Sequence, residues 1–233
     1  MRGLQELPML KMCAQLLLVT TPAQDSVEGT MTPYSRDAEG AWHQAMPSFP
    51  VVVGRKGMAW DEETLQNLGR AGSSRIKREG DGCSPIGCFP LIAAFGIAQA
   101  ADILMPYHPI QGLEGVDDPA SRHYNRLVRR HEINEVDWKS AEKMEDYELE
   151  YAWGAVVGYN WHTPKPHAGS CIFLHVWLSP QKGTSGCTAM EGDTMLRILK
   201  WLDSTCYPYL VQCPASVYED LREVEQLPVL RTP

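Results

Sequence analysis

Residues 170–190 read SCIFLHVWLSPQKGTSGCTAM, and this stretch decides the expected fold. Its first part alternates, which predicts a strand over 170–177. One face of that strand would carry Cys171, Phe173 and His175, and the other Ile172, Leu174 and Val176. Ser179, Pro180 and Gly183 then favour a loop. A strand, a loop and a returning segment would bring His175 and Cys187 together.

The pairing of Cys187 with His175 suggests a cysteine nucleophile for acyl transfer. A thiol reacts as thiolate, and a histidine within hydrogen-bond reach can take its proton. Gly186 removes a side chain where a substrate carbonyl must approach, and backbone N–H groups at such a turn can bind an oxyanion. Further candidate oxyanion or substrate-binding residues lie nearby: Thr184, Ser185, Thr188 and Trp177. The alternative is a buried cysteine after a glycine turn, with a core histidine.

The other apolar segments of the chain predict a mainly β protein with several appended helices. Strands are expected at 14–20, 50–54, 155–159 and around 209–211, with a hairpin and loop over 25–50. Helices are expected at 122–130, 140–153, 195–202 and 217–226. Glycine and proline predict a rigid multi-turn loop over 79–90. No shift in composition marks a boundary, so one domain over 1–233 is expected.

Composition narrows the class of partner. The chain has 233 residues and a formal net charge of -8, which argues against nucleic acid as partner. No apolar run approaches the roughly 20 residues needed to cross a bilayer. Leu16–Val19 is expected to be a first strand, with the apolar part of a signal peptide as the alternative. The oligomeric state is not readable.

The seven cysteines leave the redox state open. An odd count leaves at least one thiol free unless it pairs between chains. The close pairs Cys83/Cys88 and Cys206/Cys213 could be disulfides in an oxidising compartment. Neither has zinc-knuckle spacing. No metal and no cofactor is therefore expected, and a redox or metal protein is kept only as a third hypothesis.

Two further segments hold candidate binding groups. Asp81, between Gly80 and Gly82, could contact a metal or substrate, but the favoured interpretation is a tight turn. Tyr159 and Asn160 follow a predicted strand, and Asn160 could bind a peptide carbonyl. A plain turn at the end of that strand is the alternative.

Taken together, three ordered motifs resemble the L,D-transpeptidase (YkuD-like) catalytic domain. They are GDGCSPIGCFPL at 80–91, SCIFLH at 170–175 and TSGC at 184–187. The chain looks like an uncharacterised branch, carrying WGAVVGYN at 153–160 and GCTAM at 186–190. The resemblance covers about residues 14–213, and three motifs in order are far more specific than one.

The resemblance implies a β-sandwich-like core with short helices and a role in cell-wall biogenesis and cell shape. Cys187 would attack the amide at the L-centre of a diaminopimelate-type residue in a peptidoglycan tetrapeptide stem. D-alanine would leave while His175 relays protons. The thioester would pass to an amine of a second stem, forming a 3→3 cross-link, or to water, making the enzyme an L,D-carboxypeptidase. The family acts in the periplasm or elsewhere outside the cytoplasm, and carbapenems acylate its cysteine.

The chain departs from the commoner family pattern near the nucleophile. Ser185 stands where many members have His, and Ala189 where many have Asn or Arg. The interval between His175 and Cys187 is also shorter than in many members. These departures concern donor and acceptor specificity, and they motivate the alternative of a non-catalytic wall-binding domain.

Overall fold

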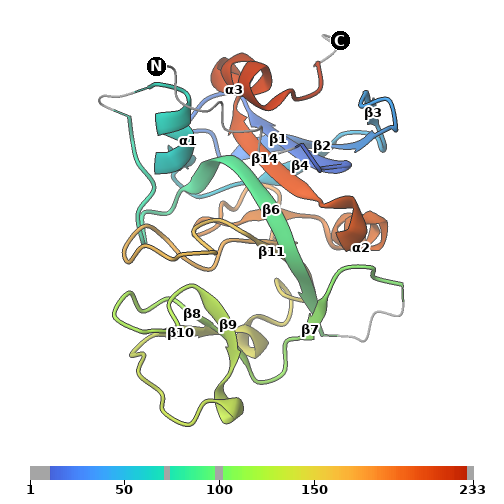
Figure 1. Ribbon diagram of the computed structural model, residues 1–233. Coiled ribbons are helices and arrows are strands. Elements are labelled where there is room, and N and C mark those ends of the chain that lie inside the picture. The colour runs from blue at the N-terminus through green and yellow to red at the C-terminus, as the bar shows by residue number, and fades with distance from the viewer. Residues whose placement is uncertain (1–10, 71–73, 98–101, 230–233) are drawn as a thin grey trace.

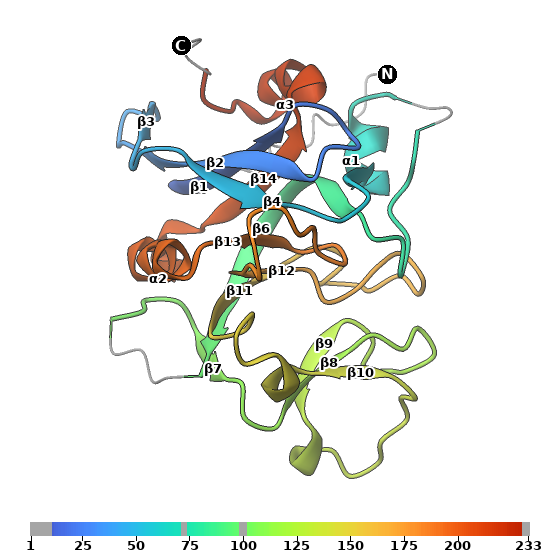
Figure 2. The same cartoon turned by 180° about the vertical axis from the view of Figure 1, so that it is seen from behind.

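The computed structural model describes residues 11–70, 74–97 and 102–229. Figures 1 and 2 show two sheets, a large one and a smaller one beyond its lower edge. The chain is mainly β, with 36% strand and 17% helix, and its large sheet is barrel-like. The expected one-domain span 1–233 includes four short segments outside the described residues.

Eleven strands of the described residues form the large sheet, in the order β1-β14-β6-β11-β12-β13-β4-β2-β3, with β5 and β7 paired to β6. Their bounds are β1 Gln15–Thr21, β2 Glu28–Arg36, β3 Trp42–Gln44, β4 Phe49–Val52, β5 Met58–Trp60, β6 Ser84–Gly96, β7 Tyr107–Pro109, β11 Trp153–Val157, β12 Phe173–Val176, β13 Thr188–Met190 and β14 Tyr209–Pro214. Strand β1 pairs both with β14 and with β2. This double pairing closes the sheet into a ring, which removes most free strand edges.

The strands expected at 14–20, 50–54, 155–159, 170–177 and 209–211 are confirmed as β1, β4, β11, β12 and β14. The expected hairpin over 25–50 is β2 and β3, which pair antiparallel. In β12 the alternation holds as expected. Leu174 packs into the main core cluster, whereas Phe173 packs into a second cluster on the other face.

The prediction of a loop over 79–90 is wrong for most of that range. Only residues 79–83 turn, and β6 begins at Ser84 as the longest strand of the chain, 13 residues. It pairs with β14 on one side and with β11 on the other. Burial between two partners therefore overrides the local preference of Pro85, Gly87 and Pro90 for turns.

The prediction of helices at 122–130 and 140–153 is also wrong. The first range instead contains strand β9 Arg126–Arg129 and the second contains strand β10 Ala141–Lys143. Both pair with β8 Leu113–Val116 in the small sheet, in the order β10-β8-β9. Val116, Val128 and Trp138 make its core. Asn125 has φ 58, which ends any helix there, and 3-10 turns η1 Arg130–Glu132 and η2 Met144–Tyr147 follow the strands. Long-range pairing decides the structure where helical propensity is weak.

Helices pack on the outside of the large sheet. The helices expected at 195–202 and 217–226 are confirmed as α2 Gly192–Trp201 and α3 Tyr218–Glu225. Glu191 caps α2 by accepting from the backbone N–H groups of Asp193 and Thr194. The other helical elements are short: α1 Glu62–Asn67, η3 Ser204–Cys206 and η4 Ala215–Val217. No helix in the described ranges has the length and apolar content to span a membrane.

Candidate active site

Two neighbouring parallel strands place His175 and Cys187 on one face of the large sheet. His175 on β12 lies opposite Ala189 on β13. Cys187 precedes Ala189 by two residues, so its side chain leaves the backbone on the same face as the side chain of Ala189. The Phe173 backbone N–H donates to the Cys187 Sγ at 3.3 Å, which fixes Cys187 beside β12.

Both side chains open into a cavity of about 280 Å³. The cavity is lined by residues of β12, of the loop before β13 and of the segment that begins with β10, and Figure 2 shows β10 below β12 and β13. Cys187 and His175 each keep 8% of their surface exposed, which is the part that faces this space. Its lining residues are Arg55, Glu142, Tyr147, Glu150, Tyr151, His175, Trp177, Leu178, Lys182, Gly183, Thr184, Ser185, Cys187 and Ala189.

Burial keeps the Cys187 thiol protonated. Desolvation first, and then the nearby charge of Glu142, raise the pKa of this thiol to about 12, against the opposing effect of the Phe173 N–H. The thiol can donate to the Cys171 carbonyl at 3.5 Å. At neutral pH this thiol would therefore stay almost entirely un-ionised without help. A nucleophile in this position therefore needs a base.

His175 has the form that a general base requires. Its Nδ1 lies 2.8 Å from the Val176 carbonyl oxygen. A carbonyl only accepts, so Nδ1 carries the proton and Nε2 keeps its lone pair. Burial lowers the pKa of His175, so the ring is neutral near pH 7. The ring of Tyr151 stands edge-on to it, with centroids 5.5 Å apart, and holds its orientation.

Ser84 supports the nucleophile turn from behind. Its hydroxyl donates to the Cys187 carbonyl at 3.0 Å and accepts from the Gly54 N–H at 2.9 Å. Thr184 Oγ1 donates to the same carbonyl at 2.6 Å and accepts from the Gly186 N–H at 3.1 Å. Gly186 has φ 154, and a Cβ there would lie 3.1 Å from the Cys83 carbonyl oxygen. Glycine is therefore the residue that fits this position.

Ser84→Ala is expected to lower the free energy of unfolding by about 2 kcal/mol, because it leaves the buried Gly54 N–H without a partner. Urea denaturation measures the loss. Ser204→Ala is the control, since that hydroxyl donates to the Leu104 carbonyl at an exposed site. Equal stability of the two variants would contradict the supporting role of Ser84.

The loop over Gly80, Asp81 and Gly82 is a structural turn that joins the motifs. Asp81 accepts from the Lys77 ammonium at 2.7 Å and from the backbone N–H of Cys83 at 2.9 Å. Just before it, Glu79 accepts from the Ser170 hydroxyl at 2.7 Å. The three motifs therefore touch one another: residues 79–84 contact both the start of the β12 segment and the Cys187 turn.

The structure brings some of the candidate residues together and not others. Trp177, Thr184 and Ser185 line the cavity with Cys187 and His175. Gly186 shapes the turn without lining the cavity. Thr188 points to the other face, where its hydroxyl donates to Gln212 Oε1 at 2.7 Å.

Tyr159 and Asn160 lie away from this cavity. They line a different one, of about 400 Å³. The Tyr159 hydroxyl donates to the Ala168 carbonyl at 2.6 Å. Asn160 has φ 50, and its side chain bonds the backbone of Lys165 and Gly169. The turn considered as the alternative for this segment is therefore what these side chains stabilise.

Sequence reasoning missed the charged groups of the cavity. Arg55 comes from the turn after β4, and its Nη1 donates to the Ser185 Oγ at 3.0 Å. Glu142 comes from β10 and accepts from the Tyr151 hydroxyl at 2.7 Å. Lys182 and Glu150 complete the set. Nothing in their local sequence distinguishes these residues, because only the tertiary fold brings them to Cys187.

All seven cysteines are free thiols, including Cys83/Cys88 and Cys206/Cys213, the two pairs considered as disulfides. Within the described ranges, no three side chains of the His, Cys, Asp and Glu types cluster as metal ligands would.

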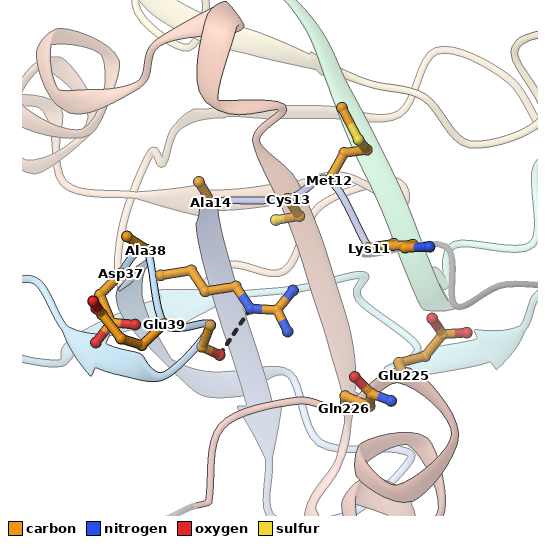
Figure 3. Close-up of a pocket in the computed structure, with 11 residues that line it drawn as sticks. Lys11, Met12, Cys13, Ala14, Asp37, Ala38, Glu39, Glu225 and Gln226 are labelled. Atoms are coloured by element: carbon orange, nitrogen blue, oxygen red, sulfur yellow. Dashed lines mark hydrogen bonds between the residues drawn. The ribbon is translucent and has the colours of Figure 1, made fainter.

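A second cysteine, Cys13, lines a larger cavity of about 600 Å³ in another part of the molecule. Figure 3 shows this cavity, with Cys13 on one side and Glu225, the last residue of α3, on another. At its wall the Arg36 Nε donates to the Gly40 carbonyl at 2.9 Å. Burial raises the pKa of Cys13 to about 12 here as well. The residues lining this cavity include no histidine, so Cys13 lacks the base that accompanies Cys187.

No family model matches the chain, and comparisons with curated proteins and with solved structures give no match.

Proposed function

We propose that the protein is a cysteine acyltransferase of the L,D-transpeptidase type, acting on peptidoglycan tetrapeptide stems. In this proposal, the barrel-like sheet is a variant of the sandwich-like core of that family. Support comes from the three motifs of the resemblance, the first of which is distant in sequence from the other two: it reaches Cys187 through Ser84, and the preceding residue Glu79 bonds Ser170. Peptidoglycan lies outside the cytoplasmic membrane, so the proposal includes an extracytoplasmic location.

One observation carries the proposal: Cys187 and a correctly protonated His175 open into the same cavity. His175 Nε2 would take the thiol proton as Cys187 Sγ attacks the amide carbonyl of the donor stem. The same proton would then pass to the nitrogen of the departing D-alanine, leaving a thioester and a neutral imidazole.

The tetrahedral oxyanion needs donors from the backbone of the Cys187 turn. The Gly186 N–H already donates to Thr184, so it is not the donor. The N–H groups of Ser185 and Cys187 are the remaining candidates of this turn, and Thr184 Oγ1 keeps the turn in shape.

The test is incubation of the purified chain with disaccharide tetrapeptide, followed by chromatography and mass spectrometry. A 3→3 dimer is expected if an amine of a second stem accepts the acyl group. A tripeptide is expected where water accepts it, which is the L,D-carboxypeptidase outcome. If neither product forms and no D-alanine is released, the proposal fails.

Arg55 is the proposed partner for a carboxylate of the donor stem. Its guanidinium is a cation at the wall of the cavity. Ala189, another lining residue, offers no polar group there. A Cβ at Gly82, which has φ 73, would lie 3.3 Å from the Arg55 guanidinium, so glycine at this position leaves room for the arginine side chain.

Arg55→Gln is therefore expected to raise KM for tetrapeptide about tenfold, with a smaller change in kcat, because an Arg–carboxylate contact is lost. Steady-state release of D-alanine measures both constants. Lys56→Gln is the matched control, since Lys56 is its exposed neighbour outside the cavity lining. The same KM for both variants would contradict a role for Arg55.

A further inference from the structure

Glu142 is one of two acidic residues lining the cavity, with Glu150, and the reaction described so far uses neither. It is placed there by the small sheet, through pairing of β10 with β8 opposite Gly115. The Tyr151 hydroxyl donates to its Oε1 at 2.7 Å, and the Tyr151 ring contacts His175. The Tyr151 side chain therefore positions both the Glu142 carboxylate and the His175 imidazole at the same cavity.

The surroundings of Glu142 favour uptake of a proton by its carboxylate. Burial raises its pKa, and the charges of Asp117 and Glu150 raise it further, against the hydrogen bond from Tyr151. Asp117 Oδ1 is a buried side-chain oxygen with no hydrogen-bond partner among the described residues. Tyr147, Cys171 and Cys187 also lie within electrostatic reach of Glu142. A cation entering here would relieve this excess of negative charge.

Resting on the proposed function, we infer that Glu142 is a catalytic residue of the second half-reaction: its carboxylate binds the ammonium group of the acyl acceptor and takes one proton from it. An ammonium ion is not a nucleophile, so it must lose one proton before it attacks and a second as the amide forms, whereas water attacks as the neutral molecule and loses only one proton, to His175. Glu142 therefore determines whether an amine or water accepts the acyl group.

The acceptor ammonium gives one proton to the Glu142 carboxylate and becomes a neutral amine. Its nitrogen attacks the thioester carbonyl, and His175 Nε2 removes a second proton from that nitrogen. The C–S bond then breaks, the amide forms, and the imidazolium returns its proton to the Cys187 sulfur. Glu142 releases its proton to water.

The test separates the two half-reactions. The wild type, Glu142→Gln and Glu148→Gln are each incubated with tetrapeptide donor and a stem carrying the acceptor amine. Glutamine keeps the size of Glu142 and can still accept from Tyr151. Glu148 is the control because it is an exposed acid on the same segment and lies outside the cavity lining. Acyl-enzyme formation and the ratio of cross-linked product to tripeptide are read by mass spectrometry.

In Glu142→Gln we expect the acyl-enzyme to form and the product ratio to fall about 100-fold, as for loss of a general base. Hydroxylamine is a neutral amine near pH 7 and should react equally with all three acyl-enzymes. An unchanged ratio in Glu142→Gln, an equal fall in Glu148→Gln, or failure of Glu142→Gln to form the acyl-enzyme would overturn the inference. Absence of acyl-enzyme in the wild type would instead overturn the proposed function.

Discussion

Replacement of Cys187 by alanine is expected to lower D-alanine release from tetrapeptide by at least about 1,000-fold, to the background of the assay. The thiol supplies the only bond between enzyme and acyl group in the proposed reaction, so no partial function remains without it. Alanine also fits the site, because Cys187 is a small side chain in the cluster around Phe173. The measurement is the initial rate of D-alanine release at neutral pH.

Cys13→Ala is the matched control for this loss. Cys13 is also buried, also lines a cavity, and also has a pKa raised by burial to about 12. It lacks only a neighbouring histidine in that cavity. Its replacement should leave D-alanine release within about twofold of the wild type. A similar loss in both variants would mean that packing, and not the Cys187 sulfur, explains the effect.

His175→Gln is expected to lower the acylation rate at pH 7 by about 1,000-fold, within the range seen for general bases. The pH profile distinguishes this cause from misfolding. In the wild type, the rate should rise with pH through the lowered pKa of His175, below 6.5, and then level off. In the variant only thiolate reacts, so the rate should rise about 100-fold between pH 7 and 9, since the thiol pKa is about 12.

His108→Gln provides the control for the histidine substitution. Burial lowers the pKa of His108 as well, but it lies on β7, outside the Cys187 cavity. Its pH profile should match the wild type. A flat profile for His175→Gln between pH 7 and 9 would contradict the assignment of His175 as the base.

Much of the sheet was predictable because its strands are continuous buried segments. In β12 the two faces pack into two different clusters, so the alternation of apolar residues was unambiguous. The small sheet was not predictable. Ala141, Glu142 and Lys143 resemble the start of a helix, and only their pairing with β8 makes them a strand. The same holds for Pro85 and Gly87 in β6, which local preference assigns to turns.

The candidate site also contains residues that the sequence could predict and residues that it could not. Cys187 and His175 were recognisable because their chemistry and spacing are local, and the motif residues around Ser84 supported them. Arg55, Glu142 and Tyr151 are brought to the cavity by segments far apart in the chain. Asn160, which could bind a peptide carbonyl by its residue type, lies away from this cavity, and its side chain bonds the backbone of Lys165 and Gly169. Asparagine also tolerates a positive φ, and that property explains its presence in this turn.

The most direct test of the account is to find the residue that carries an acyl group. The purified chain is treated with a carbapenem, its intact mass is measured, and the modified peptide is sequenced by tandem mass spectrometry. The account predicts one adduct per chain, on Cys187, absent from Cys187→Ala and retained in Cys13→Ala. An unmodified Cys187, or an adduct on any other of the seven cysteines, would contradict it.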